Sequence, residues 1–168
     1  MARHPHRLPL DQYRGFYCYF LTASTYGRRA SFLDPALCAA VTTQLFQSTQ
    51  KHGFAVIAYC LMPDHVHVLV EGEQPDADFL KWLRLWRQLS GFWERRRTGQ
   101  YLWQEGYWDY TLRDDESVIG IAAYVVANPV RAGLVRSPEQ YPYLGSARYS
   151  LTELMAAVQE RPRGGSDG

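Results

Sequence analysis

The chain has 168 residues, of which 46% are hydrophobic and 21% are charged, a balance typical of one globular domain with short extensions. Its formal net charge is +1, so the chain as a whole is not strongly basic. No run of eighteen apolar residues occurs, and the basic N-terminus leads into no apolar segment, so we expect a cytoplasmic protein with neither a membrane span nor a secretory signal.

The first half of the chain predicts a strand, a helix and a hairpin. Aromatic and β-branched residues cluster over residues 16–24, which favours a strand. A helix is predicted over residues 35–51, where Asp34 can cap the first turn and proline occupies the first helical position. Residues 54–62 and 65–71 predict two further strands, and the short turn between them makes the pair a hairpin.

The second half predicts a long helix, a strand and a last helix. The long helix is expected over residues 76–97, because large apolar residues recur there at three- and four-residue spacing. They are Phe79, Trp82, Leu83, Trp86, Leu89, Phe92 and Trp93. A fourth strand is expected over residues 107–113 and a last helix over residues 116–127, which Pro129 should end.

This order of elements predicts the fold class. Strand, helix, strand, strand, helix and strand in succession favour an α+β, ferredoxin-like fold, in which one antiparallel sheet carries helices on one face. The last helix is additional to that arrangement. We expect residues 1–13, rich in proline and arginine, to form an extended basic arm, and residues 161–168 to form a disordered polar tail.

Two histidines on the third predicted strand are candidates for a metal site. His65 and His67 lie two residues apart and therefore point to the same side of a strand, where two imidazoles can bind one ion. Val66, Val68 and Val70 alternate with them and can face the core. Two such histidines can equally be hydrogen-bonded neighbours on a half-exposed strand, so a metal site requires a third ligand.

The last predicted helix offers polar groups on one face. Tyr124 and Asn128 are four residues apart, and Gly120 continues the same stripe. An amide oxygen is a hard donor suited to magnesium or manganese. The alternatives are structural: Asn128 can be the helix-ending residue before a proline, and Tyr124 can be one of many aromatic residues between packed elements.

Together these motifs resemble a known family. Leu61-Met-Pro-Asp-His-Val-His67, followed by Tyr124-x-x-x-Asn-Pro-Val-Arg-Ala-Gly-Leu134, resembles the IS200-like single-tyrosine transposases, and in particular their REP-associated branch. These proteins are HUH endonucleases, named for two histidines around a hydrophobic residue. Supporting matches are residues 16–22, 103–109 and 141–146. The resemblance covers residues 14–150, which we expect to be the transposase domain, with residues 151–168 as a C-terminal extension.

The resemblance implies a role for each matching residue. Tyr124 would be the nucleophile that forms a 5′-phosphotyrosine with DNA, on the additional helix of the HUH endonuclease fold. His65 and His67 would bind a divalent metal, Mg²⁺ or Mn²⁺, and Asn128 would complete that site, although other branches often have glutamine there. The implied substrates are single-stranded DNA and DNA hairpins formed by palindromic repeats.

Aromatic and arginine side chains are candidates for contacts with that DNA, because bases stack on aromatic rings and guanidinium groups hold phosphates. The candidates are Arg28, Arg29, Arg84, Arg87, Tyr107, Trp108, Arg113 and Arg131. Two other functions stay open: a hairpin-binding module of the same fold that does not cut, and a small metal-binding regulatory domain. A homodimer and a monomer are both compatible with the sequence.

Overall fold

The computed structural model describes residue 9 and residues 13–114 and 116–160. The predictions for the tail and for almost all of the basic arm lie outside these residues. Tyr13 is an exception, since it is buried and its hydroxyl donates to Asp109 at 2.8 Å. No helix in the described ranges is both long and apolar enough to cross a membrane.

Five strands form one antiparallel sheet, which confirms the predicted fold class. The strands are β1 (Cys18–Ser24), β2 (Phe54–Met62), β3 (His65–Gly72), β4 (Trp108–Thr111) and β5 (Leu144–Gly145). Their order in the sheet is β4-β1-β3-β2-β5. β2 and β3 form the predicted hairpin, whereas the two-residue β5 is too short for a periodic pattern to reveal it.

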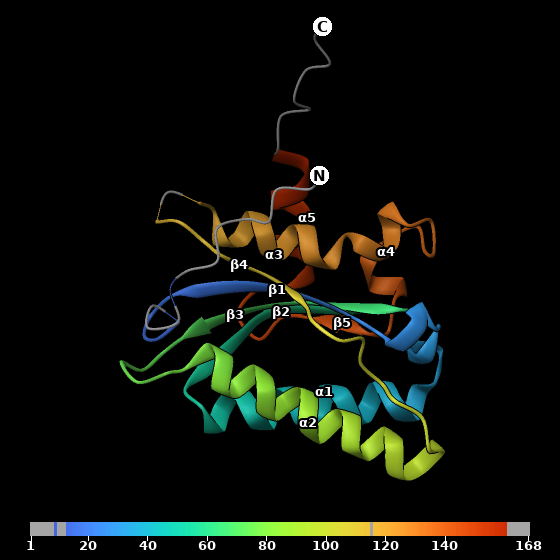
Figure 1. The fold of residues 1–168 in the computed structure, drawn as a ribbon. Coiled ribbons are helices and arrows are strands. Elements are labelled where there is room, and N and C mark those ends of the chain that lie inside the picture. The colour runs from blue at the N-terminus through green and yellow to red at the C-terminus, as the bar shows by residue number, and fades with distance from the viewer. Residues whose placement is uncertain (1–8, 10–12, 115, 161–168) are drawn as a thin grey trace, which may run out of the picture.

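Helices cover both faces of this sheet (Figure 1). They are α1 (Pro35–Lys51), α2 (Phe79–Thr98), α3 (Val118–Val126), α4 (Asn128–Arg131) and α5 (Leu151–Glu160). Short 3-10 turns are η2 (Tyr26–Arg28), η3 (Ser31–Leu33) and η4 (Pro138–Gln140). α1 and α2 lie side by side on one face, and α3 and α5 lie on the other (Figure 1).

The alternation along β3 divides the core into two halves. Val66, Val68 and Val70 are completely buried on the side of α1 and α2, as the sequence predicts. The stacked rings of Trp82 and Trp86, 5.8 Å apart, are part of the same cluster. The intervening residues of β3 therefore face α3, and the two histidines are among them.

The chain beyond the last predicted helix departs from expectation. Pro129 does not end the helical region, because it occupies the first turn of α4, where a missing backbone N–H is tolerated. The preceding Ala127 keeps helical dihedral angles of −80° and −8°. The direction of the chain therefore changes gradually, and Asn128 becomes the first residue of a short new helix.

α5 packs against α3 and holds it on the sheet. Its start follows a capping-box pattern, since the Glu153 side chain accepts from the Ser150 backbone N–H at 2.7 Å and the Ser150 hydroxyl accepts from the Glu153 N–H at 3.2 Å. Leu154 is completely buried against the α3 side of the sheet. The C-terminal extension thus supplies part of the core on that side.

Candidate active site

The imidazoles of His65 and His67 turn toward each other on the α3 side of β3, with their Nε2 atoms 3.1 Å apart. Two nitrogens that bind one ion at about 2.1 Å each, at roughly a right angle, lie about 3.0 Å apart. The same spacing also suits an N–H···N hydrogen bond between the rings. The pair is therefore arranged so that both Nε2 atoms can reach a common partner.

The opposite nitrogen of each ring is fixed by a neighbour. His65 Nδ1 lies 2.6 Å from Asp64 Oδ1, and His67 Nδ1 lies 2.9 Å from Thr22 Oγ1. An ionised carboxylate only accepts, so His65 carries its proton on Nδ1 and presents a lone pair at Nε2. Asp64 is held in turn by Arg28, whose Nε lies 3.1 Å from Asp64 Oδ2. Such outer partners orient metal-binding histidines in known sites.

His67 is held in its neutral form. Burial, with smaller contributions from the neighbouring imidazole of His65 and the guanidinium of Arg131, lowers the pKa of His67 from 6.5 to about 3. A neutral imidazole is the form that binds a metal ion. The Phe20 ring stacks on the His67 imidazole, with centroids 5.6 Å apart and planes 16° apart, and contributes to that burial.

Tyr124 lies on α3, whose first turn is capped by the Ser117 hydroxyl accepting from the Gly120 N–H. The tyrosine is 40% exposed, so its hydroxyl is not sealed in the core. Its ring meets Phe20 edge to face, with centroids 6.2 Å apart. Phe20 therefore contacts both Tyr124 and His67, and the predicted nucleophile and the histidine pair belong to one neighbourhood.

Asn128 is tied to the end of α3. Its Nδ2 donates to the carbonyl oxygens of Tyr124 and Val125 at 3.2 and 3.1 Å, and its Oδ1 accepts from Arg131 at 2.8 Å. Arg131 also donates to the Tyr124 carbonyl at 3.1 Å, and its guanidinium lies 3.8 Å from the centre of the Tyr124 ring. The amide oxygen expected to serve as a ligand is therefore engaged by a cation.

The donor set near the histidines is small. Among the residues that the structure describes, no group of three or more His, Cys, Asp or Glu side chains could hold a metal ion. A third ligand from these described residues would be of another type, such as the amide oxygen of Asn128. Two imidazoles with oriented Nε2 atoms fit a divalent ion that takes its remaining ligands from amide, water or phosphate oxygens.

The DNA-contact candidates fall into separate groups. Trp108, 39% exposed, meets Phe20 edge to face at 5.6 Å, so it borders the site, as do Arg28 and Arg131. Arg29 donates to the carbonyl of Tyr101 instead. Arg113 is exposed after β4, and the remaining candidates line a different pocket of about 390 Å³. These are Arg84, Arg87 and Tyr107.

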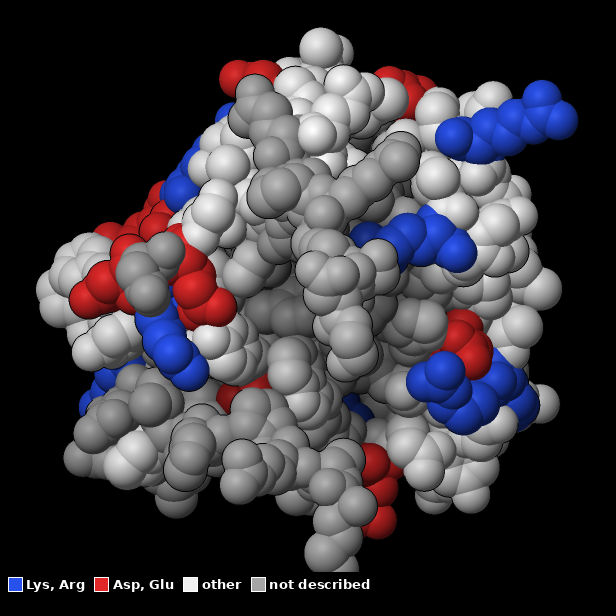
Figure 2. Space-filling model, turned by 90° about the horizontal axis from the view of Figure 1, so that it is seen from above, with Lys and Arg blue, Asp and Glu red and all other residues white. Residues whose placement is uncertain are grey.

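Figure 2 shows lysine and arginine groups separated by acidic and uncharged residues where the described surface over α3 and α5 is visible. A small apolar pocket of about 170 Å³ adjoins Tyr124, with Val158 of α5 on its wall. Arg131 lines the same pocket, so a cation lies beside the tyrosine.

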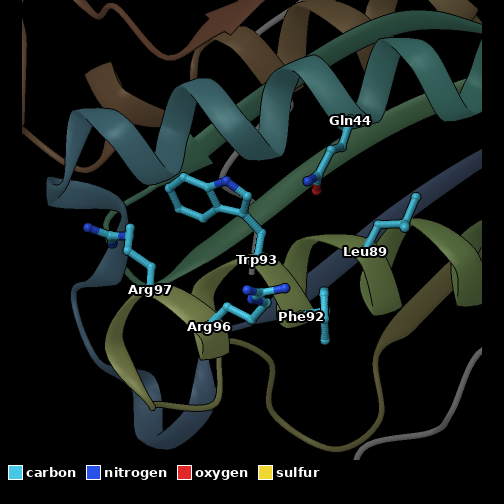
Figure 3. Close-up of a pocket in the computed structure, with 6 residues that line it drawn as sticks. All are labelled: Gln44, Leu89, Phe92, Trp93, Arg96 and Arg97. Atoms are coloured by element: carbon cyan, nitrogen blue, oxygen red, sulfur yellow. The ribbon is translucent and has the colours of Figure 1, made fainter.

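A larger pocket lies on the other side of the sheet. It has about 440 Å³ between α1 and α2, and Figure 3 shows Phe92, Trp93 and Arg96 of α2 around it. Gln44 of α1 faces them across the groove (Figure 3). Because the sheet separates this pocket from Tyr124, it contributes nothing to the candidate site.

Sequence reasoning missed three residues of the site: Phe20, Thr22 and Asp64. Asp64 precedes His65 directly, so its proximity could have been anticipated. Phe20 and Thr22 are two residues apart on β1 and therefore share a face. Thr22 pairs with His67 in the register of β1 and β3. Finding them required knowing that β1 lies next to β3 in the sheet.

The chain is similar in sequence to known transposases. The family model described as "Transposase IS200 like" matches residues 17–128. A Haemophilus influenzae protein assigned as a REP-associated tyrosine transposase is 25% identical over 136 residues, which cover 74% of this chain and 77% of that protein. The REP-associated tyrosine transposase of Escherichia coli is 21% identical over 138 residues, covering 80% and 81% of the two chains.

Solved structures share the fold. The structure of a REP-associated tyrosine transposase bound to a REP hairpin matches with a TM-score of 0.67 and 19% identity, over 86% of this chain and 82% of that one. A Deinococcus radiodurans protein assigned as a transposase matches with a TM-score of 0.51 and 19% identity, over 66% and 88%. Since the family model covers well over half of the sequence, this chain belongs to the IS200-like transposase family, with REP-associated tyrosine transposases among its relatives.

Proposed function

We propose that the protein is a metal-dependent, single-strand-specific DNA endonuclease and strand transferase that cleaves hairpin-associated sites through a 5′-phosphotyrosine. The observation that carries this proposal is the contact of one ring, Phe20, with both His67 and Tyr124. Phe20 thereby links a candidate nucleophile to a pair of imidazoles whose Nε2 atoms converge. Membership of a transposase family supports the same reaction class.

The reaction would be a phosphoryl transfer. The Tyr124 hydroxyl oxygen attacks the phosphorus, a Tyr–O–P bond forms, and the bond from phosphorus to the 3′-oxygen breaks. The tyrosine proton is lost and the leaving oxygen takes up a proton, so a free 3′-hydroxyl results. Attack by a second 3′-hydroxyl on the phosphotyrosine then rejoins DNA without a nucleotide triphosphate, because each step exchanges one phosphoester for another.

In this proposal His65 and His67 hold the metal through Nε2, and Asn128 supplies a third ligand. A bound Mg²⁺ or Mn²⁺ would supply charge stabilisation at the scissile phosphate and the leaving oxygen. Asp64 and Thr22 keep the two imidazoles oriented through their Nδ1 atoms.

We propose that the DNA partner is a hairpin with adjacent single-stranded bases, by analogy with the REP hairpin bound to the solved relative, and that the protein acts on nucleoid DNA in the cytoplasm. Trp108 is the first candidate for base stacking, since it is exposed beside Phe20. The other proposed phosphate and base contacts are Arg28, Arg29, Arg84, Arg87, Tyr107, Arg113 and Arg131.

We also propose that residues 14–150 are the catalytic unit and that it works as a monomer with the tyrosine helix in cis. The packing of α5 on α3 supports this choice over a homodimer that exchanges α3. Leu154 anchors the interface from the C-terminal extension.

The decisive experiment uses single-stranded oligonucleotides that contain a palindromic hairpin with adjacent unpaired bases, labelled at either end. With Mn²⁺ or Mg²⁺, the 3′-label should migrate with the protein on a denaturing gel, and the 5′-label should remain on a free shortened strand. Tyr124→Phe should abolish the adduct, and His65→Ala combined with His67→Ala should abolish it while hairpin binding persists. A wild-type protein that binds the hairpin but never forms an adduct would instead be a non-catalytic binding module.

A further inference from the structure

A closed set of hydrogen bonds joins the proposed nucleophile and the proposed third ligand through Arg131. The guanidinium donates both to the Tyr124 carbonyl and to Asn128 Oδ1, while Asn128 Nδ2 donates to the same Tyr124 carbonyl. The guanidinium also covers the Tyr124 ring, 3.8 Å from its centre. Arg131 therefore fixes both the residue that would attack DNA and the residue that would bind metal.

Asn128 can bind a cation through one atom only. The amide nitrogen is a donor, so Oδ1 is the only possible ligand atom, and it already accepts from Arg131 at 2.8 Å. A divalent ion on that oxygen would lie a few ångströms from the guanidinium, at a distance where like charges repel strongly outside bulk water. Arg131 and a divalent ion therefore compete for Asn128.

Arg131 is also linked to the histidine pair through a chain of ring contacts. Its guanidinium covers the Tyr124 ring, the Tyr124 ring meets Phe20 edge to face, and Phe20 stacks on the His67 imidazole. The arginine that engages Asn128 therefore belongs to the same neighbourhood as the proposed metal ligands.

Arg131 can leave this position at small cost in packing. The residue is exposed, and its partners among the described residues are one side-chain oxygen, one carbonyl and one face of a ring. A DNA phosphate would offer the guanidinium a stronger, bidentate, charge-assisted partner than the neutral amide. The scissile phosphate must approach Tyr124, so that partner would arrive beside Arg131.

We propose that Arg131 is a positioning residue that occupies Asn128 until substrate arrives, and then moves to the DNA phosphate and frees the amide oxygen for the metal. This inference rests on the proposed function and adds the order in which DNA and metal bind to the site. Metal and DNA then bind cooperatively, because DNA draws Arg131 away from the metal ligand and bound metal releases Arg131 for the DNA phosphate.

The test measures Mn²⁺ binding to the full chain without DNA, by electron paramagnetic resonance of free Mn²⁺. Arg131→Gln should bind Mn²⁺ about fivefold or more tightly than wild type, the size of a typical coupling between sites. In an Asn128→Ala background the same substitution should change nothing. Arg96→Gln is the matched control, since it also removes an arginine stacked on an aromatic ring but lies on α2, across the sheet, and should leave the affinity unchanged.

A second measurement follows the DNA. A non-cleavable single-stranded oligonucleotide should raise the Mn²⁺ affinity of the wild type and leave that of Arg131→Gln unchanged. At saturating Mn²⁺, Arg131→Gln should form the covalent adduct at least about tenfold more slowly, because the phosphate loses its partner. Arg131→Lys keeps the charge but loses the planar guanidinium group, so its rate of adduct formation should lie between those of wild type and Arg131→Gln. If circular dichroism shows that Arg131→Gln is unfolded, Arg131→Lys replaces it in both measurements.

Unchanged or weaker Mn²⁺ binding by Arg131→Gln would overturn the inference, as would an increase that persists without Asn128. Failure of the proposed function has a different signature. In that case the His65→Ala, His67→Ala protein would bind Mn²⁺ as tightly as wild type, or wild type would form no adduct in any metal.

Discussion

The ring of Phe20 lies nearly parallel to the imidazole of His67, with centroids 5.6 Å apart. Phe20 comes from β1 and His67 from β3, the adjacent strand. The same ring meets Tyr124 edge to face. One apolar side chain therefore determines how close the proposed nucleophile stands to the proposed metal ligand.

Replacing Phe20 by alanine should slow adduct formation by about tenfold to a hundredfold, because a displacement of about 1 Å at a reacting centre has effects of that size. Mn²⁺ affinity should change much less, since both Nδ1 partners of the histidines remain. Single-turnover kinetics on the labelled hairpin measure the effect. Phe92→Ala, which removes an exposed ring on the opposite side of the sheet, is the control. Equal rates for the two variants would rule out a positioning role.

Asp64→Asn should weaken Mn²⁺ binding by about tenfold to a hundredfold, the usual effect of removing an outer partner of a metal-binding histidine. The substitution keeps the shape but loses the charge that pairs with His65 and Arg28. Metal titration measures it directly. Asp76→Asn, at an exposed position after β3, should have no effect. A wild-type affinity in Asp64→Asn would mean that His65 is oriented by packing alone.

The stability of the protein should fall as pH decreases from 6.5 toward 3. His67 has a folded-state pKa of about 3 against 6.5 when unfolded, so within this window the unfolded chain binds one more proton than the folded chain. The stability contributed by neutral His67 is fully present above pH 6.5. As pH falls below 6.5, the free energy of unfolding decreases by at most about 1.4 kcal/mol per pH unit. Urea unfolding at pH 7 and pH 5, with chelator present, should show a smaller pH difference for His67→Gln than for wild type. Identical differences would contradict the buried, neutral state of His67.

Leu154→Ala should destabilise the protein by about 2–4 kcal/mol, as expected when a fully buried leucine is truncated. Val158→Ala on the same helix removes a side chain that is 42% exposed and should cost less than about 1 kcal/mol. Urea unfolding followed by circular dichroism compares them. A small loss for both would show that α5 is dispensable for the fold.

Much of the site follows from the periodicity of the sequence. Alternation along β3 places His65 and His67 on one face and Val66, Val68 and Val70 on the other. Helical spacing places Tyr124 and Asn128 at the same end of α3. Strand alternation and helical spacing involve residues close together in the chain, so they can be recognised in a single sequence.

The remaining features depend on the arrangement of elements in space. The contact of Phe20 with His67 requires β1 to lie beside β3, which no local pattern specifies. The engagement of Asn128 by Arg131 requires the helical path to continue through Pro129, although a proline usually argues for a helix end. α5 was not predicted, because only the short capping pattern of Ser150 and Glu153 marks its start.

The packing of α5 on α3 has a genetic consequence. Under the proposed cis arrangement, the α3 helix of each molecule serves that molecule's own histidine pair. A catalytically dead allele such as Tyr124→Phe, expressed together with the normal one, should therefore be recessive: each intact molecule would still process its own strand, and the defective molecules would do no more than occupy DNA.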